Sequence, residues 1–151
     1  MKVNANRFPW VGSEIDLKEG ERVLVLASGK VTNGDLIDQP PNGYLEMRVG
    51  ERTFFFSFSG KLAGMTCFPN CGYYQDFKTG YDGELKFAVR DWGDTYPPPK
   101  DWYKDNSGSF LLDVFVYDPE QKEGFKRFLR AMIQNNPEDL MFTAQAQAFL
   151  K

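Results

Sequence analysis

The chain has 151 residues, the length of one domain, and a domain of this length buries roughly two thirds of its unfolded surface. Its 18 basic and 21 acidic residues give a net charge of −3, without the excess of cations that phosphate contacts require, so we expect no nucleic-acid partner. Histidine is absent, which excludes Ser-His-Asp and Cys-His catalysis and every zinc site that contains histidine. We also expect a soluble chain with no signal peptide and no membrane span, because every apolar run is far shorter than the roughly 18 residues of a membrane helix.

The first part of the sequence favours β structure. Aromatic residues make up 16% of the chain, and 14 Gly and 9 Pro supply turn residues. Strands are predicted over residues 22–27, 44–49, 53–58, 84–90 and 110–117. In the fourth of these, Leu85, Phe87 and Val89 share one face, as in a half-buried strand. The fifth is apolar on both sides, so we expect the C-terminal residues to cover its outer face.

The pattern changes to a helical one at Asp118, which suits an N-cap, followed by Pro119 at the first helical position. One stripe of this helix consists of Phe125, Phe128, Leu129, Met132 and Ile133. Residues 135–137 end it and begin a second helix. On that helix the expected buried side consists of Leu140, Met141, Ala144, Ala148 and Phe149. We therefore predict a β-sandwich over residues 1–118 and a helical hairpin over 119–151, packed on the sandwich or on a partner chain in a homo-oligomer.

Residues 90–109 concentrate carboxylates, an amide and aromatic rings between two predicted strands. Calcium binds about six to eight oxygen ligands, whereas zinc and copper prefer histidine or thiolate, so a metal bound here should be calcium. The alternative is an ordinary acidic turn, in which residues 105–108 make local Asx-type hydrogen bonds.

Cys67 and Cys71 flank a short turn sequence. Their spacing is compatible with a local disulfide and equally with two separate loop thiols. A zinc site would need further ligands that the chain lacks.

Five segments, in order, resemble the PA-I galactophilic lectin family. They are Ile15-Asp16-Leu17 with Gly20, then residues 23–29, 44–50, 83–91 and 105–110. The resemblance spans about residues 10–117 and is most specific at Asp91 and in the run from Asn106 to Phe110. It implies an all-β fold, a galactose-binding-like jelly-roll β-sandwich, with one calcium ion in the loops at one end that ligates two neighbouring sugar hydroxyls.

The resemblance also implies a set of ligands. Asp91 matches the carboxylate ligand, while Asp105 and Asn106 match a pair of Asn ligands. Asn33 and Trp102 match positions that supply backbone carbonyls. The sugar is expected among Asn33, Asp91, Trp92, Asp94, Trp102 and Asp105, and rings available to stack on it are Trp92, Tyr96, Trp102 and Tyr103. The family's His and Gln that hold the sugar have no counterpart, so galactose need not be preferred.

These observations predict a calcium-dependent carbohydrate-binding domain without enzymatic activity. The alternative is a non-catalytic interaction or oligomerisation domain of the same fold that has lost sugar binding and works through its hairpin. A third hypothesis is an enzyme in which Asp91 and Asp94 act as acid and base on a glycosidic bond. Calcium binding separates the first two.

Overall fold

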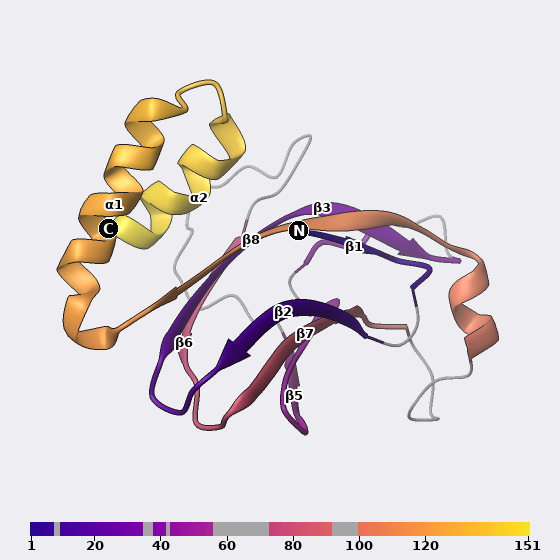
Figure 1. Ribbon diagram of the computed structural model, residues 1–151. Helices are drawn as coiled ribbons and strands as arrows, with labels where there is room; N and C mark the ends of the chain where they lie inside the picture. The colour runs from indigo at the N-terminus through magenta and orange to yellow at the C-terminus, as the bar shows by residue number, and fades with distance from the viewer. Residues whose placement is uncertain (8–9, 35–37, 42, 56–72, 92–99) are drawn as a thin grey trace.

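The computed structural model describes residues 1–151 except 8–9, 35–37, 42, 56–72 and 92–99. Two antiparallel sheets of four strands each face one another, with strand orders β1-β8-β3-β6 and β2-β7-β4-β5 (Figure 1). The strands are β1 (Lys2–Asn4), β2 (Val11–Leu17), β3 (Arg22–Asn33), β4 (Leu45–Val49), β5 (Arg52–Phe55), β6 (Tyr73–Lys78), β7 (Gly83–Val89) and β8 (Asn106–Tyr117). The predicted β-sandwich with a C-terminal pair of helices is confirmed.

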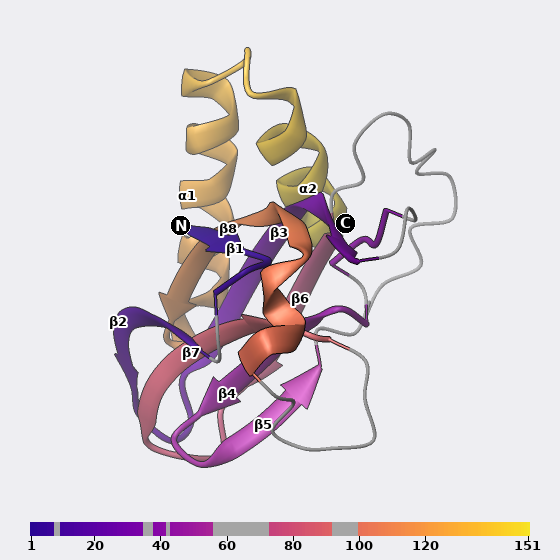
Figure 2. The same cartoon turned by 90° about the vertical axis from the view of Figure 1, so that its right-hand side faces the viewer.

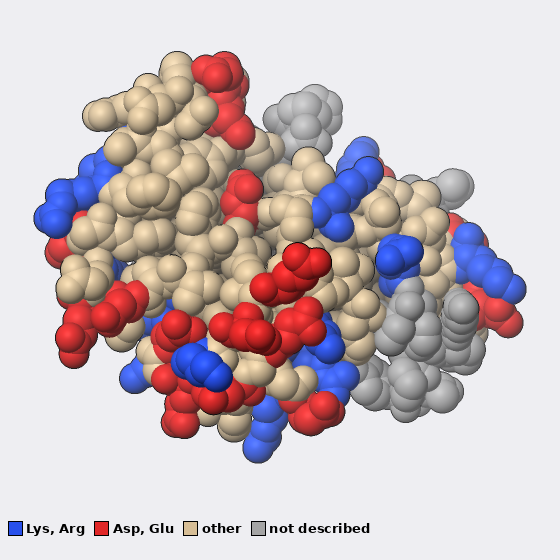
Figure 3. Space-filling view, viewed as in Figure 1, with Lys and Arg blue, Asp and Glu red and all other residues tan. Residues whose placement is uncertain are grey.

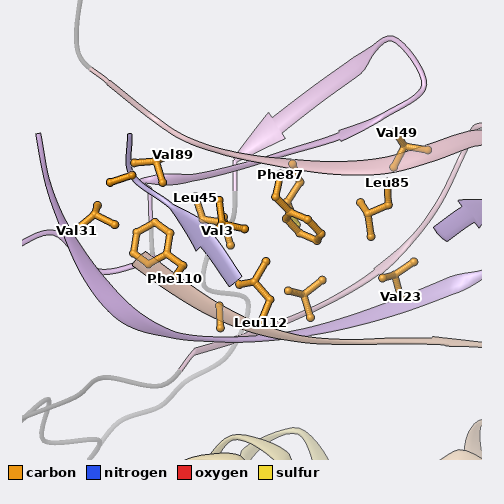
Figure 4. Close-up of a cluster of buried hydrophobic side chains, with 14 of the residues drawn as sticks. Val3, Val23, Val31, Leu45, Val49, Leu85, Phe87, Val89, Phe110 and Leu112 are labelled. Atoms are coloured by element: carbon orange, nitrogen blue, oxygen red, sulfur yellow. The ribbon is translucent and has the colours of Figure 1, made fainter. Parts of the chain in front are cut away.

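The main core lies between the two sheets (Figure 4). Leu85, Phe87 and Val89 all point into it from β7 and are fully buried, as their alternation predicts. Phe110 and Leu112 reach the same core from β8. Burial of this many aliphatic and aromatic side chains is the main source of stability for the sandwich.

Strand β3 is buried on both faces, which explains its continuous apolar sequence. Val23 and Val25 face the other sheet, whereas Leu24 and Leu26 face the helices. The structure pairs β3 with β8 over 12 residues, from Arg22 opposite Tyr117 to Asn33 opposite Asn106. Both strands extend beyond their predicted ranges, toward the loops at one end of the sandwich.

The C-terminal residues form a hairpin of helices that lies on the sheet containing β3 and β8 (Figures 1 and 2). A 3₁₀ turn, η2 (Pro119–Gln121), is capped by Asp118 and leads into α1 (Lys122–Asn135), which is followed by α2 (Leu140–Leu150). A second apolar cluster joins the hairpin to the sheet. Its buried members are Leu24, Leu26, Tyr117, Leu129, Phe142 and Ala146. The apolar stripe of α1 thus packs on the strand that contains Phe115 and Tyr117. Phe128 lies at the margin of this contact: its ring touches that of Phe115 edge-on, yet the residue is 51% exposed.

The buried side of α2 agrees with the predicted one only in part, since Phe149 packs on the second apolar cluster as predicted but Leu140 does not. Phe142, Gln145 and Ala146 are buried, whereas Leu140 is 74% exposed. Because the helix is apolar on nearly every side, its sequence gives no reliable stripe. Three strands, β1, β2 and β6, were not predicted, and residues 56–58 of the predicted 53–58 strand, like Cys67 and Cys71, lie outside the described residues. In the described part of the chain, no helix has the length and apolar character needed to cross a membrane.

Candidate functional site

The predicted site residues lie at one end of the sandwich, where β3 ends and β8 begins. Asn33 and Asn106 face each other across this pair of strands. Asp91 follows β7, and a short 3₁₀ helix, η1 (Lys100–Lys104), precedes β8. Figure 2 views the molecule from this end, with η1 in front. A cavity of about 330 Å³ here is lined by Asn33, Asp91, Asp101, Trp102 and Asp105.

Two asparagine side chains at this end are held by their amide nitrogens. Asn106 Nδ2 donates to Asp91 Oδ2 at 3.0 Å and to the Ala5 carbonyl at 3.3 Å. Asn33 Nδ2 donates to the Arg90 carbonyl at 2.8 Å. These bonds fix both amides and leave their oxygens for another partner.

The amide oxygens Oδ1 of Asn33 and Asn106 are buried and accept no hydrogen bond from the described residues. Only four buried side-chain atoms in the described part of the chain lack a partner, and these are two of them. A buried acceptor without a partner costs about 1–3 kcal/mol. A ligand that binds oxygen would remove this cost.

Asp105 is positioned by the turn that ends β3. Its carboxylate lies against Gly34, whose φ of 74° is in the left-handed region that favours glycine. A Cβ at Gly34 would lie 2.9 Å from Asp105 Cγ, so the absence of a side chain makes room for the carboxylate.

The atoms of these side chains that could ligate a metal ion strongly are all oxygens. Asp91 and Asp105 offer carboxylates, and Asn33 and Asn106 offer amide oxygens. Among the described residues, no three His, Cys, Asp or Glu lie close enough together to hold a metal ion, so a cation here would need amide and backbone oxygens as well. Such a mixed oxygen set fits calcium and does not fit zinc or copper.

Two residues of η1 add to the cavity. Trp102 is 39% exposed, which leaves part of its ring accessible to a ligand. Asp101, which was not among the predicted ligands, also lines the cavity and forms a surface ion pair with Lys104. Tyr103 is only 4% exposed, so the expectation that it stacks on a sugar is wrong.

The structure therefore gathers Asn33, Asp91, Trp102 and Asp105 around one cavity, with Asn106 bonded to Asp91. Trp92, Asp94 and Tyr96 lie outside the described residues. The residues of the acidic turn expected as the alternative belong to this site. Asn106 is the first residue of β8, and its side chain bonds to residues distant in sequence rather than within a local turn.

The fold is that of a lectin-like β-sandwich. A solved structure described as the EclA N-terminal domain, a PllA-like lectin, is similar to this chain with a TM-score of 0.56 and 23% sequence identity. The similarity covers 78% of this chain and 94% of the other one. No protein-family model matches the chain, and no curated protein matches it either.

Proposed function

We propose that the chain is a calcium-dependent carbohydrate-binding domain related to the PA-I galactophilic lectins. The observation that carries the proposal is the pair of buried, unpartnered amide oxygens of Asn33 and Asn106 beside the carboxylates of Asp91 and Asp105. The lectin-like fold supports a role in binding rather than catalysis.

Each residue has a definable role in this proposal. Asp91 and Asp105 supply the charge that balances a divalent cation, and Asn33 and Asn106 supply oxygens already fixed by bonds to Arg90, Asp91 and Ala5. The chemistry that calcium supplies when bound is direct coordination of two neighbouring hydroxyls of a sugar. Trp102 presents a partly exposed ring that suits the apolar face of a sugar.

Thermal unfolding with and without calcium tests the metal site. A ligand that binds only the folded chain at about 100 times its dissociation constant adds roughly 2.7 kcal/mol, or about 5–10 °C in Tm for a chain of this size. We expect this rise at millimolar calcium and not with magnesium, which prefers to keep its water shell. An unchanged Tm at millimolar calcium would contradict the proposal.

Matched variants test whether the rise in Tm with calcium depends on the residues of the cavity. Asp91→Asn should abolish the calcium response, because it removes one carboxylate from the cavity. Asp38→Asn is the control: it removes one negative charge from an exposed ion pair with Lys30, and Asp38 does not line the cavity. We expect Asp38→Asn to keep the full response. Loss of the response in both variants would indicate a general charge effect.

Sugar binding is tested separately on a glycan array, probed with calcium and then with a chelator. We expect weak, calcium-dependent binding to sugars with neighbouring hydroxyls in suitable geometry, with a monosaccharide dissociation constant of about 1 mM. Signals that persist with the chelator would contradict the mechanism. A calcium-loaded chain with no signal would favour the interaction domain that has lost sugar binding, which the exposed Phe128 and Leu140 of the hairpin would suit.

A further inference from the structure

Only part of strand β8 is paired on its outer edge. β1 covers residues 109–111, and the amide of Leu112 donates to the Met1 carbonyl at 2.8 Å while the Met1 ammonium donates to the Leu112 carbonyl. Both backbone groups of Leu112 therefore point to this edge. Because the backbone groups of an antiparallel strand alternate in direction, those of Val114 and Val116 point to it too.

No described strand pairs with the edge at Val114 and Val116. In the described part of the chain, β3 is the only strand that pairs with this stretch of β8, and it lies on the opposite side. An open sheet edge presents unpaired N–H and C=O groups, which an added strand can bind. Val116 is also 38% exposed, so the edge is accessible from solvent.

A cavity of about 580 Å³ lies beside this edge, between the sheet and the tip of the hairpin. Asp113 and Phe115 line it from β8, and they alternate with the residues whose backbone groups point outward. Other lining residues are Met132, Glu138, Asp139 and Phe142. The cavity thus combines an apolar floor with carboxylates.

The charge around the cavity is negative. Asp113, Glu138 and Asp139 form no ion pair with any residue in the described ranges. Burial raises the pKa of Asp113; the Met1 ammonium opposes this shift and Asp139 adds to it. Figure 3 shows acidic side chains at the tip of the hairpin and a small acidic patch below it, in an area that is otherwise uncharged.

We propose that the outer edge of β8 at Val114 and Val116 binds an extended segment of a partner protein in which Lys or Arg alternates with apolar residues. The backbone of the segment would pair with β8. Side chains of a strand alternate between its two faces, so one set would lie over the cavity. Long basic side chains suit that set, because their stems can contact Phe115 and Phe142 while their charged ends reach the carboxylates.

A second copy of this chain suits the edge less well. Pairing two β8 edges would bring Asp113, Glu138 and Asp139 of both copies toward one interface, and like charges in such positions repel. The charge of the cavity therefore favours a basic partner over a second copy.

The direct test is the binding of a labelled peptide, acetyl-Arg-Val-Arg-Val-Arg-Val-amide, to the full chain by fluorescence anisotropy. We expect a dissociation constant below about 1 mM at 50 mM salt and weaker binding at 300 mM salt, because the ion pairs lie near the surface. A peptide with Glu in place of Arg should bind at least tenfold more weakly. No binding of the Arg peptide, or equal binding of the Glu peptide, would overturn the proposal.

Two N-methylated peptides test strand addition itself. One is methylated at the three Val nitrogens and the other at the three Arg nitrogens. Because only alternate N–H groups of an added strand face β8, one of these peptides should lose binding and the other should keep it. Equal binding of both would overturn the proposal.

Variants of the chain place the binding on this edge. Val116→Pro removes an N–H that points outward, so it costs no bond to β3, and we expect about tenfold weaker peptide binding. Asp113→Asn with Glu138→Gln should reduce both the affinity and its salt dependence, whereas Asp38→Asn should change neither. If Val116→Pro does not fold, the methylated peptides decide the matter.

Two further outcomes are distinguishable. Peptide binding should persist with a chelator, so failure of the calcium proposal would leave it intact. A sedimentation coefficient that rises with concentration in the wild-type chain, and not in Val116→Pro, would show a second copy on the edge and overturn the proposal of a basic partner.

Discussion

Gly34 and Asp105 occupy adjoining space at the end of β3, where the carboxylate of Asp105 fills the position that a side chain at residue 34 would need. The two residues come from segments distant in sequence and meet because β3 and β8 pair in register up to Asn33 and Asn106. The turn that ends β3 therefore also determines where one carboxylate of the site lies.

Gly34→Ala should weaken calcium binding. The added Cβ would lie 2.9 Å from Asp105 Cγ and closer still to a carboxylate oxygen, so Asp105 must move. The left-handed backbone also disfavours Ala, with a cost of roughly 1–2 kcal/mol. We expect a lower Tm without calcium and a smaller rise on its addition, measured by thermal unfolding.

Gly43→Ala is the matched control for this change. Gly43 has a φ of 81°, close to that of Gly34, but apart from its chain neighbours no atom of the described residues lies within 4 Å of the position of its Cβ. The control should therefore lose stability through backbone strain and keep the full calcium response. If both variants respond to calcium like the wild-type chain, Asp105 does not contribute to the site.

The sequence indicates which residues could ligate a metal ion, but not how these residues are arranged in space. The polar run before β8 and the end of β7 stand out by composition, and the lectin resemblance connects them with Asn33. The amide of Asn106 is fixed by the hydrogen bonds that it donates to Asp91 and to Ala5, which lies 101 residues away. Such contacts depend on the pairing of β1 and β3 with β8, which local patterns do not encode.

Strand prediction succeeded where apolar residues alternate or run continuously, as in β7 and β3. It missed β1, which has only three residues, and β6, whose sequence is largely polar and aromatic. It also missed β2, where a shift in register lies between Gly12 and Asp16 and Glu14 has a φ of 62°. This irregularity breaks the alternation that identifies a strand.

Phe142 and Leu140, two residues apart at the start of α2, provide a test of helix packing. Phe142 is 6% exposed and belongs to the cluster that joins the hairpin to the sheet, whereas Leu140 is 74% exposed. Phe142→Ala should lower the free energy of unfolding by about 3–5 kcal/mol, because it leaves a cavity. Leu140→Ala should change it by less than about 0.5 kcal/mol. Urea unfolding measures both, and similar losses would contradict the observed orientation of α2.

Gln145 holds α2 on the sheet through a buried side chain. Its Nε2 donates to the Ala27 carbonyl at 2.7 Å and to the Tyr73 carbonyl at 3.3 Å, on the neighbouring strands β3 and β6. Gln145→Ala should cost about 1–3 kcal/mol, because both carbonyls lose a donor. Hydrogen exchange of α2 should increase in this variant. Gln147→Ala, an exposed change on the same helix, should leave exchange unchanged, and equal effects would show that the two bonds do not hold the helix.

The last prediction concerns Tyr117, where β8 meets the hairpin. Its hydroxyl donates to Asp76 Oδ1 at 2.9 Å and accepts from Arg22 Nε at 3.1 Å, and its ring stacks on Phe125 with centroids 4.3 Å apart. Burial and the bond to the Asp76 carboxylate raise the pKa of Tyr117 to about 12. The Tyr117 hydroxyl therefore retains its proton to a higher pH in the folded chain than in the unfolded chain, where its pKa is about 10.

This difference gives a contribution to stability that is fully present below about pH 10 and is lost as the pH rises through 12. By pH 11 the wild-type chain should have lost a stabilisation on the order of 1 kcal/mol from this group, a loss that Tyr117→Phe cannot show because it has no hydroxyl. At pH 7 the variant should be less stable by about 1 kcal/mol, since it lacks the bonds to Asp76 and Arg22. The gap in the free energy of urea unfolding between the two chains should therefore narrow between pH 9 and pH 11. Parallel profiles over that range would mean that the Tyr117 hydroxyl titrates alike in the folded and unfolded chains.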